Sequence, residues 1–392
     1  MKGNNRSAFA IVSVAICFAF FMFVLDAPLM AIVKFALAVG ALAACGFTLS
    51  KLYGFENWGG MFLLRSKQGL DFIDRVSKKY PKAWQAAADI GMVIGYGSLA
   101  YFLMGKRKGG WKEKLPTFAI GSLLMVTLLN VVAPMSMAVI FALLSGGSEF
   151  ASAGSKLNSS LAGVELFKYV YFVLMAVGGI ALVTTLSIFT YCAMLLATIV
   201  PALFGGNFSA IAQTTPGGTP IIPGINLPLI EGIIALAIVL VVHEGMHGIV
   251  ARLYKLPLKS AGLVFFGFLP FGAFVDIDEK KLFKAKKEQQ NAVFVAGTAA
   301  NFATAIIFML LFFAFIYSIG DIRNSATGFI ARVVGLTFAL NFVVAAMNLV
   351  PLPLFDGYHI MRNGVRNETV AKVIAYAIGA AFLLALLPWI FR

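Results

Sequence analysis

Two histidines and a glutamate stand together in the run His243-Glu244-Gly245-Met246-His247. On an α-helix, positions i and i+4 lie on one face, so both imidazoles would point to the same side. Two imidazoles placed in this way can bind one Zn²⁺, and the glutamate beside the first can take a proton from a water molecule. The pattern predicts a hydrolytic zinc site with His243 and His247 as ligands and Glu244 as the catalytic acid–base.

The surroundings of this motif favour a functional interpretation. It follows the apolar run 234–240, and ionisable side chains at membrane depth cost free energy and usually have a function. The competing interpretation is a pair of core histidines in a polar helix contact. That interpretation leaves three ionisable residues within five positions unexplained.

A catalytic zinc needs a third protein ligand and an open position. Asp356 is a candidate because Pro351 and Pro353 end the preceding helical run and the flexible Gly357 follows. Irregular backbone at this point could turn a carboxylate back into a site. Taken alone, the same residues are typical of an ordinary Asp-Gly turn.

Composition indicates an integral membrane protein. The 392 residues are 60% hydrophobic and 12% charged, with a mean hydropathy of +0.90. A soluble domain has about twice that share of charged residues. The net charge of +14 does not indicate nucleic acid, because Lys and Arg cluster in short connections between apolar runs, as in cytoplasmic loops. Cys17, Cys45 and Cys192 lie in apolar runs and predict no disulfide and no cysteine metal site.

Apolar runs of spanning length recur along the chain and predict about nine transmembrane helices. The expected spans are 8–25, 28–48, 86–105, 117–145, 168–204, 229–253, 290–318, 328–350 and 369–390. The first is expected to be an uncleaved span rather than a signal peptide. The predicted fold class is therefore an all-α polytopic membrane protein.

Two connections are long enough to hold structure of their own. Residues 51–85, with Phe62-Leu63-Leu64 and several lysines and arginines, could form an amphipathic helix on an anionic membrane surface or a solvated basic loop. Residues 205–228 are rich in Gly and Pro and predict an irregular loop.

Topology follows from the basic connections. The lysines of 280–287 and the end of the 229–253 helix are expected to be cytoplasmic, which also places the N-terminus inside. The same count places the basic residues between 106 and 114 outside, against the rule. Either 168–204 is two short helices or one of the earlier runs does not cross.

Three motifs in order give the chain a resemblance to the site-2 protease family of intramembrane zinc metalloproteases. They are His243 to His247, Gly297-Thr-Ala-Ala-Asn301 on the next span, and the segment from Asn348 to Gly357. The resemblance covers about 229–366.

This resemblance implies a role for each matching residue. It makes His243, His247 and Asp356 zinc ligands and Glu244 the general base and acid. Asn301 would orient substrate or stabilise an oxyanion, and Asn348 would support the ligands. The sequence departs from the family pattern at Thr298, where Pro is common, and at Phe355, where Leu is common; neither is a ligand.

The family also has a membrane-associated β-hairpin between its first two core spans. Residues 262–275, rich in β-branched and aromatic side chains, fit such a hairpin or a packing loop. An extended edge there could pair with an unwound substrate. The connection is too short for the PDZ domain that many relatives carry.

The expected function is hydrolysis of peptide bonds in transmembrane or juxtamembrane segments of membrane proteins, with Zn²⁺ as cofactor and a membrane protein in the bilayer as partner. The resemblance adds that such cleavage is commonly regulated. The active site would lie in the bilayer nearer the cytoplasmic face. A zinc-binding transporter or sensor is the alternative, with Asp89 and Asn130 available for a pathway, and a catalytically inactive scaffold is a third.

The expected organisation has four parts. They are an N-terminal transmembrane region of unknown role at 1–205, a loop at 206–228, a three-span metalloprotease core at 229–366, and a C-terminal helix at 367–392.

Overall fold

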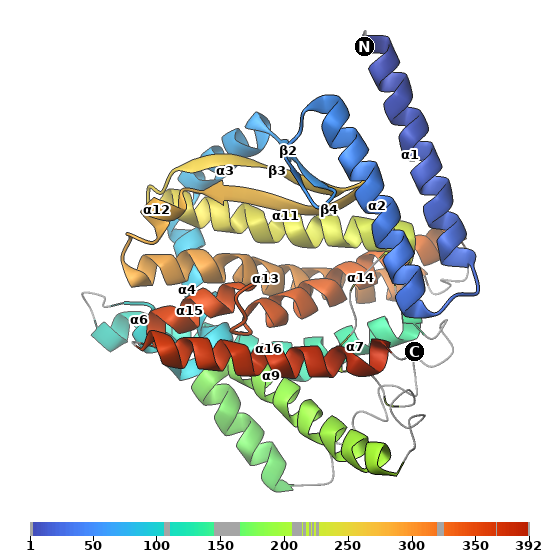
Figure 1. Cartoon of the computed structure of the whole chain (residues 1–392). Coiled ribbons are helices and arrows are strands. Elements are labelled where there is room, and N and C mark those ends of the chain that lie inside the picture. Colours follow the sequence, from blue (N-terminus) through green and yellow to red (C-terminus); the bar gives the residue numbers. More distant parts are fainter. Residues whose placement is uncertain are drawn as a thin grey trace.

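Long apolar helices make up most of the fold (Figure 1). The computed structural model describes residues 3–105, 110–144, 165–205, 229–319, 325–365 and 367–390, and residues 214, 217, 218, 221, 223, 224, 227 and 228 of the connection between them. The rest of the predicted 205–228 loop, and Lys106, Arg107 and Lys108 of the basic connection, lie outside the described residues.

Within the described ranges, nine helical segments are long and apolar enough to cross a membrane, which confirms the predicted fold class. They are α1 (Gly3–Asp26), α2 (Ala31–Tyr53), α4 (Pro81–Tyr96) with α5 (Ala100–Leu103), α6 (Gly110–Thr127) continued through a π-turn at Leu128–Val132 into α7 (Ala133–Leu144), α9 (Glu165–Phe204), α11 (Leu229–Leu253), α13 (Lys287–Ile319), α14 (Ser325–Asn348) and α16 (Glu368–Ile390).

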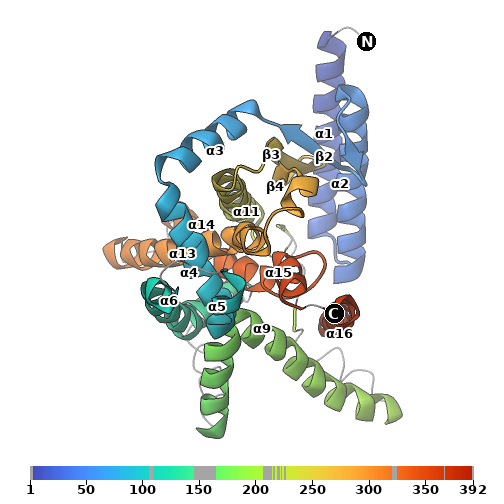
Figure 2. The same cartoon turned by 90° about the vertical axis from the view of Figure 1, so that its left-hand side faces the viewer.

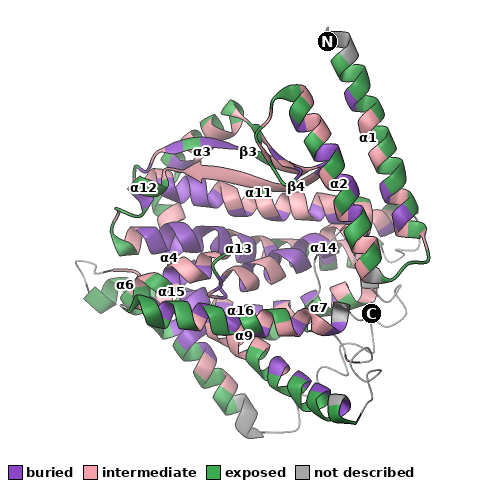
Figure 3. Ribbon diagram, viewed as in Figure 1, coloured by how far each residue is buried: buried purple, intermediate pink, exposed green. Residues whose placement is uncertain are grey.

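Helices α11, α13 and α14 lie at the centre and supply much of the buried core (Figure 3). Small residues such as Ala296 and Ala345, both fully buried, let these helices approach closely, as is typical of membrane interfaces. The outer helices α1, α9 and α16 expose many apolar side chains (Figure 3). In a bilayer, lipid would cover those faces.

A four-stranded antiparallel sheet packs along α11. Its strands, in the order β1-β2-β3-β4, are β1 (Asn57–Trp58), β2 (Met61–Arg65), β3 (Leu258–Phe266) and β4 (Leu269–Ile277). The predicted hairpin is confirmed and extends beyond 262–275, turning at Gly267 with φ 59°. Strand β4 forms one edge of the sheet, beside α11 (Figure 1).

Phe62-Leu63-Leu64 form neither the amphipathic helix nor the solvated loop that were the two alternatives for 51–85. These residues form β2, which pairs with β3 so that Phe62 lies opposite Phe265 with their rings stacked at 5.5 Å. The partner strand comes from about two hundred residues away in the chain, so local periodicity could not reveal it. The amphipathic helix exists further along as α3 (Lys67–Lys79), where the Ser66 hydroxyl accepts a hydrogen bond from the backbone of Gly69.

Two glycines with positive φ break the predicted spans near the core. Gly97 (φ 54°) ends α4, and Gly179 (φ 61°) divides α9 into two segments that diverge from the bend (Figure 2). The two bends meet, since a Cβ at Gly179 would lie 2.6 Å from the backbone nitrogen of Gly97. This bend agrees with one of the two alternatives for this part of the chain, that 168–204 is two helices.

The break at Gly97 also turns the chain back. Met104 lines the same hollow as Pro81, next to Leu253 and Tyr254 at the end of α11. The Asn291 amide of α13 donates a hydrogen bond of 3.1 Å to the carbonyl of Leu103. The described part of the basic stretch 106–114 therefore begins on the same side as the lysines of 280–287, where the short helix α12 (Glu279–Leu282) lies (Figure 1).

Candidate metal centre

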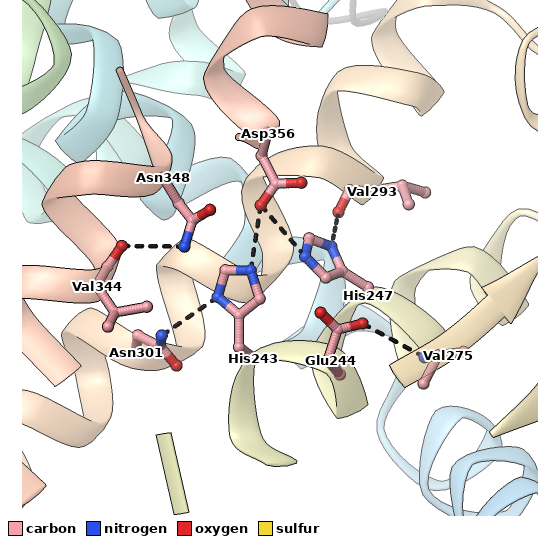
Figure 4. A network of polar contacts seen from close by, with 9 residues as sticks. All are labelled: His243, Glu244, His247, Val275, Val293, Asn301, Val344, Asn348 and Asp356. Atoms are coloured by element: carbon pink, nitrogen blue, oxygen red, sulfur yellow. Dashed lines mark hydrogen bonds and ion pairs between the residues drawn. The ribbon is translucent and has the colours of Figure 1, made fainter. Parts of the chain in front are cut away.

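Helix α11 supplies three of the site residues. His243 and His247 lie one turn apart, both buried, with ring centroids 4.6 Å apart at an interplanar angle of 80°. Their Nε2 atoms point toward the same space (Figure 4). Glu244 lies beside them on the next position of the helix.

Asp356 reaches this space from the other side. Helix α14 ends at Asn348, irregular backbone carries Pro351 and Pro353, and α15 (Asp356–Gly364) begins with the carboxylate. Its Oδ2 lies 3.2 Å from Nε2 of His243 and 3.3 Å from Nε2 of His247 (Figure 4). The fold thus brings Asp356 to two histidines that precede it by more than a hundred residues in the sequence.

Gly357 allows α15 to begin close against the backbone at the end of α14. A Cβ at this position would lie 2.2 Å from the carbonyl oxygen of Leu349 at the end of α14. Burial alone would raise the pKa of Asp356, but His247 and His243, when protonated, hold that pKa well below its usual range. The third group is therefore an ionised carboxylate, as a metal ligand must be.

Gly297 on α13 leaves the room for the two imidazoles. A Cβ there would lie 2.6 Å from Nε2 of His247 and 2.7 Å from Nε2 of His243. Any larger residue would occupy the position where the two ligand nitrogens meet the carboxylate. The imidazoles of His243 and His247 and the carboxylate of Asp356 form a cradle whose possible ligand atoms lie within 4.8 Å of one another. This set of groups fits a catalytic Zn²⁺.

The far nitrogens of both rings are also held. Nδ1 of His247 donates to the carbonyl oxygen of Val293 at 2.7 Å, which leaves Nε2 with its lone pair toward Asp356. Asn301, fully buried on α13, has its side-chain amide 3.2 Å from Nδ1 of His243. Both rings therefore have the outer partner that metal-binding histidines usually have.

The side-chain amide of Asn301 also decides which nitrogen of His243 is available to a metal. Its Oδ1 is buried without a hydrogen-bond partner while its nitrogen faces His243. The oxygen and nitrogen of an amide are assigned from the network, and rotating this one by 180° lets Nδ1–H of His243 donate to Oδ1. That arrangement satisfies the orphaned oxygen and gives His243 the tautomer whose Nε2 can bind zinc.

Glu244 contacts the hairpin. The backbone N–H of Val275 in β4 donates to Oε2 of Glu244 at 3.3 Å, which holds the carboxylate beside the histidines (Figure 4). A cavity of about 210 Å³ opens here. It is lined by His243, Glu244, His247, Val275, Ile277, Val293, Phe294, Asn348, Leu354 and Asp356.

Asn348 reaches this cavity, although its side-chain amide donates to the carbonyl of Val344 on its own helix at 3.0 Å. Thr298, where the resemblance expects Pro, is fully buried beside Gly297, and its hydroxyl has no hydrogen-bond partner. Phe355 caps the start of α15 without contributing to the cavity lining. The third histidine, His359, stacks on Phe294 at 4.5 Å, and burial lowers its pKa.

Residues 231–386 match the sequence profile of Peptidase family M50, and all of the residues just described on α11, α13, α14 and α15 fall within them. This region belongs to peptidase family M50. The match ends at residue 386 and so takes in most of α16, beyond the core expected at 229–366. A match to this family indicates a membrane metalloprotease at the level of the family, and the nine apolar helices of the described ranges suggest a multi-pass membrane protein.

Comparison with curated proteins adds little beyond the M50 region. The chain is 38% identical over 118 residues to an uncharacterized protein of Methanocaldococcus jannaschii, a match that covers 28% of this chain and 31% of the relative. The chain therefore matches about a third of the relative's length. No solved structure matches the chain.

Several contributors to the site were not predicted. The carbonyl of Val293 and the N–H of Val275 are backbone groups, so no residue type marks them. The N-terminal elements β2 and α3, which pack against the hairpin and α11, carry no motif. Gly297 belonged to a recognised motif, but its position between the imidazoles could not be inferred from spacing.

Proposed function

We propose that this chain is a zinc metalloendopeptidase that hydrolyses peptide bonds in transmembrane or juxtamembrane segments of membrane proteins, in regulated intramembrane proteolysis. The observation that carries this proposal is that Oδ2 of Asp356 lies within 3.3 Å of Nε2 of both His243 and His247. The two histidines lie on α11, which is long and apolar enough to span a bilayer, and Asp356 follows α14, which is also long and apolar enough. Glu244 lies beside them, which a site that only stores or carries metal would not require.

The residues of the site divide the chemistry between them. When bound, Zn²⁺ would lower the pKa of a water molecule and polarise the scissile carbonyl. Glu244 takes a proton from the attacking water and passes it to the departing amine, so one carboxylate serves first as base and then as acid. The N–H of Val275 keeps that carboxylate in place between the two transfers.

The hairpin suits an extended substrate. A transmembrane helix must unwind before its backbone can reach the site, and unwound backbone in lipid needs hydrogen-bond partners. Strand β4 is an edge of the sheet and ends beside the cavity at Val275 and Ile277. Pairing with this edge would hold the substrate in extended form next to Glu244.

Basic residues indicate on which side the site opens. His247 and His243 precede Arg252 by five and nine residues, or roughly 8 to 14 Å along α11. Arg252, Lys255 and the lysines of 280–287 belong on the cytoplasmic side by the positive-inside rule. The site therefore lies inside the bilayer, nearer the cytoplasmic face.

The test is to determine where in the substrate the peptide bond is cut. Purified chain in proteoliposomes is incubated with a panel of single-span membrane proteins, and the products are identified by mass. We expect at least one substrate to be cut within or next to its span, and no such product from the Glu244→Gln protein. Cuts confined to soluble loops would contradict the proposal, whereas zinc flux unchanged by Glu244→Gln would favour a transporter.

A further inference from the structure

Helix α3 presents a basic and partly aromatic face to its surroundings. Arg75, Lys78 and Lys79 are exposed, and Phe72 is 60% exposed among them. Phe72, Arg75 and Lys79 follow the i, i+3, i+7 spacing of one helical stripe. Asp71 is the exposed acidic residue of this helix. Such a face is complementary to anionic headgroups at a bilayer surface.

The opposite face of α3 is fixed to the metal-binding helix. Asp74 pairs with Arg252 in the last turn of α11, with Oδ1 2.5 Å from Nε. Ile73 is buried, and its Cδ1 lies 3.0 Å from where a Cβ would stand on Gly248. Gly248 follows His247 directly, so α3 packs within one residue of a candidate zinc ligand.

Gly248 also lies next to strand β4 of the hairpin. A Cβ on Gly248 would also lie 3.1 Å from Cγ1 of Val275, the residue whose N–H holds Glu244. Gly248 is thus the point at which α3, α11 and β4 come together. A movement of α3 would therefore displace both α11 and strand β4, which positions the carboxylate of Glu244.

We propose that α3 binds the anionic phospholipid headgroups of the leaflet next to the basic connection 280–287, and that this binding orients the end of α11 through Asp74 and Ile73. The basic face of α3 lies at the end of α11 that carries Arg252, which is where such a leaflet would begin. The orienting effect rests on the proposed peptidase function. Headgroup binding does not depend on it.

Hydrogen–deuterium exchange tests the binding without any substrate. The full chain is placed in nanodiscs of phosphatidylcholine, with or without phosphatidylglycerol, and exchange of 67–79 is followed. We expect exchange to slow by about fivefold or more with the anionic lipid, the effect of one basic residue at such a surface. Equal exchange in both discs, or the same slowing by inorganic phosphate in discs without anionic lipid, would overturn the proposal.

Charge-reversal variants test whether the lipid-dependent slowing of exchange depends on the basic residues of α3. The triple variant Arg75→Glu, Lys78→Glu, Lys79→Glu should lose the lipid-dependent slowing. The matched control Lys280→Glu, Lys281→Glu, Lys284→Glu makes the same charge change in exposed residues near α12 and should keep it. If both variants lose the slowing equally, net charge and not α3 is responsible, and the proposal is wrong.

Asp74→Asn tests the orienting step. This variant should keep the lipid-dependent slowing of exchange and its zinc content. Wild-type cleavage should run several-fold faster in the anionic discs, and the Asp74→Asn protein should cleave at the same rate in both. A variant that is still stimulated would refute the coupling. Absence of cleavage in every disc with exchange still lipid-dependent would count against the peptidase function and leave headgroup binding standing.

Discussion

The backbone N–H of Val275 lies 3.3 Å from Oε2 of Glu244 and donates to it. A strand of the hairpin and the helix of the candidate metal centre are thereby joined at the carboxylate that moves protons. Since Val275 is on the edge strand, the same short segment would contact the substrate and position the base.

Replacing Val275 by Pro removes that donor, while Val275→Ala keeps it. A hydrogen bond to a charged group contributes about 1.5–3 kcal/mol, so we expect turnover to fall by about tenfold or more in Val275→Pro. The measurement is initial cleavage rate at full zinc occupancy. Equal rates in the two variants would show that the hydrogen bond does not matter.

Gly297→Ala should prevent zinc from binding normally, because the new methyl group would lie 2.6 Å from Nε2 of His247. Gly245→Ala is the matched control, since nothing lies within 4 Å of a Cβ at that position of the motif. Zinc titration of both proteins provides the measurement. If Gly297→Ala binds zinc as tightly as Gly245→Ala, the geometry of the cradle is wrong.

Asn301→Ala should weaken zinc binding by about 10 to 100-fold, the usual effect of losing a group that orients a metal-binding histidine. Asn341→Ala removes another fully buried asparagine, whose amide donates to Thr337 on its own helix and not to the site. Its zinc affinity should stay unchanged. Loss of affinity in both variants would indicate a general loss of folding and not a role for Asn301.

The two breaks at Gly97 and Gly179 make a prediction about topology. Cysteines introduced at the exposed positions Lys112 and Lys284, in a chain without its native cysteines, should react with an impermeant maleimide from the same side of the membrane. The physical reason is that Met104 and Leu103 lie beside α11 and α13 at the end that carries the basic residues. Labelling from opposite sides would contradict the fold around Gly97.

Helical periods and apolar run lengths were sufficient to predict the spans, because each long helix satisfies its own backbone. The turn back at Gly97 was not predicted, and the bend within 168–204 was only one of two alternatives, since a glycine's φ depends on what it packs against. Strand β2 was missed for a related reason: its partner β3 is distant in the sequence.

The residues of the site also differ in whether local sequence patterns could predict them. His243, Glu244 and His247 could be recognised because helical spacing alone places them together. Asp356 was assigned through family resemblance, and the structure then brought its carboxylate to both imidazoles. The backbone contacts of Val275 and Val293 depend on the packing of β4 and α13 against α11, which no local pattern encodes.

Zinc content measured together with cleavage, in Glu244→Gln and Asp356→Ala proteins, tests the central claim most directly. We expect Glu244→Gln to hold one zinc per chain, as the wild type does, and to cleave nothing, because only the proton acceptor is lost. Asp356→Ala should lose zinc and activity together. Cleavage by metal-loaded Glu244→Gln, or full zinc in Asp356→Ala, would contradict the assignment of base and ligand.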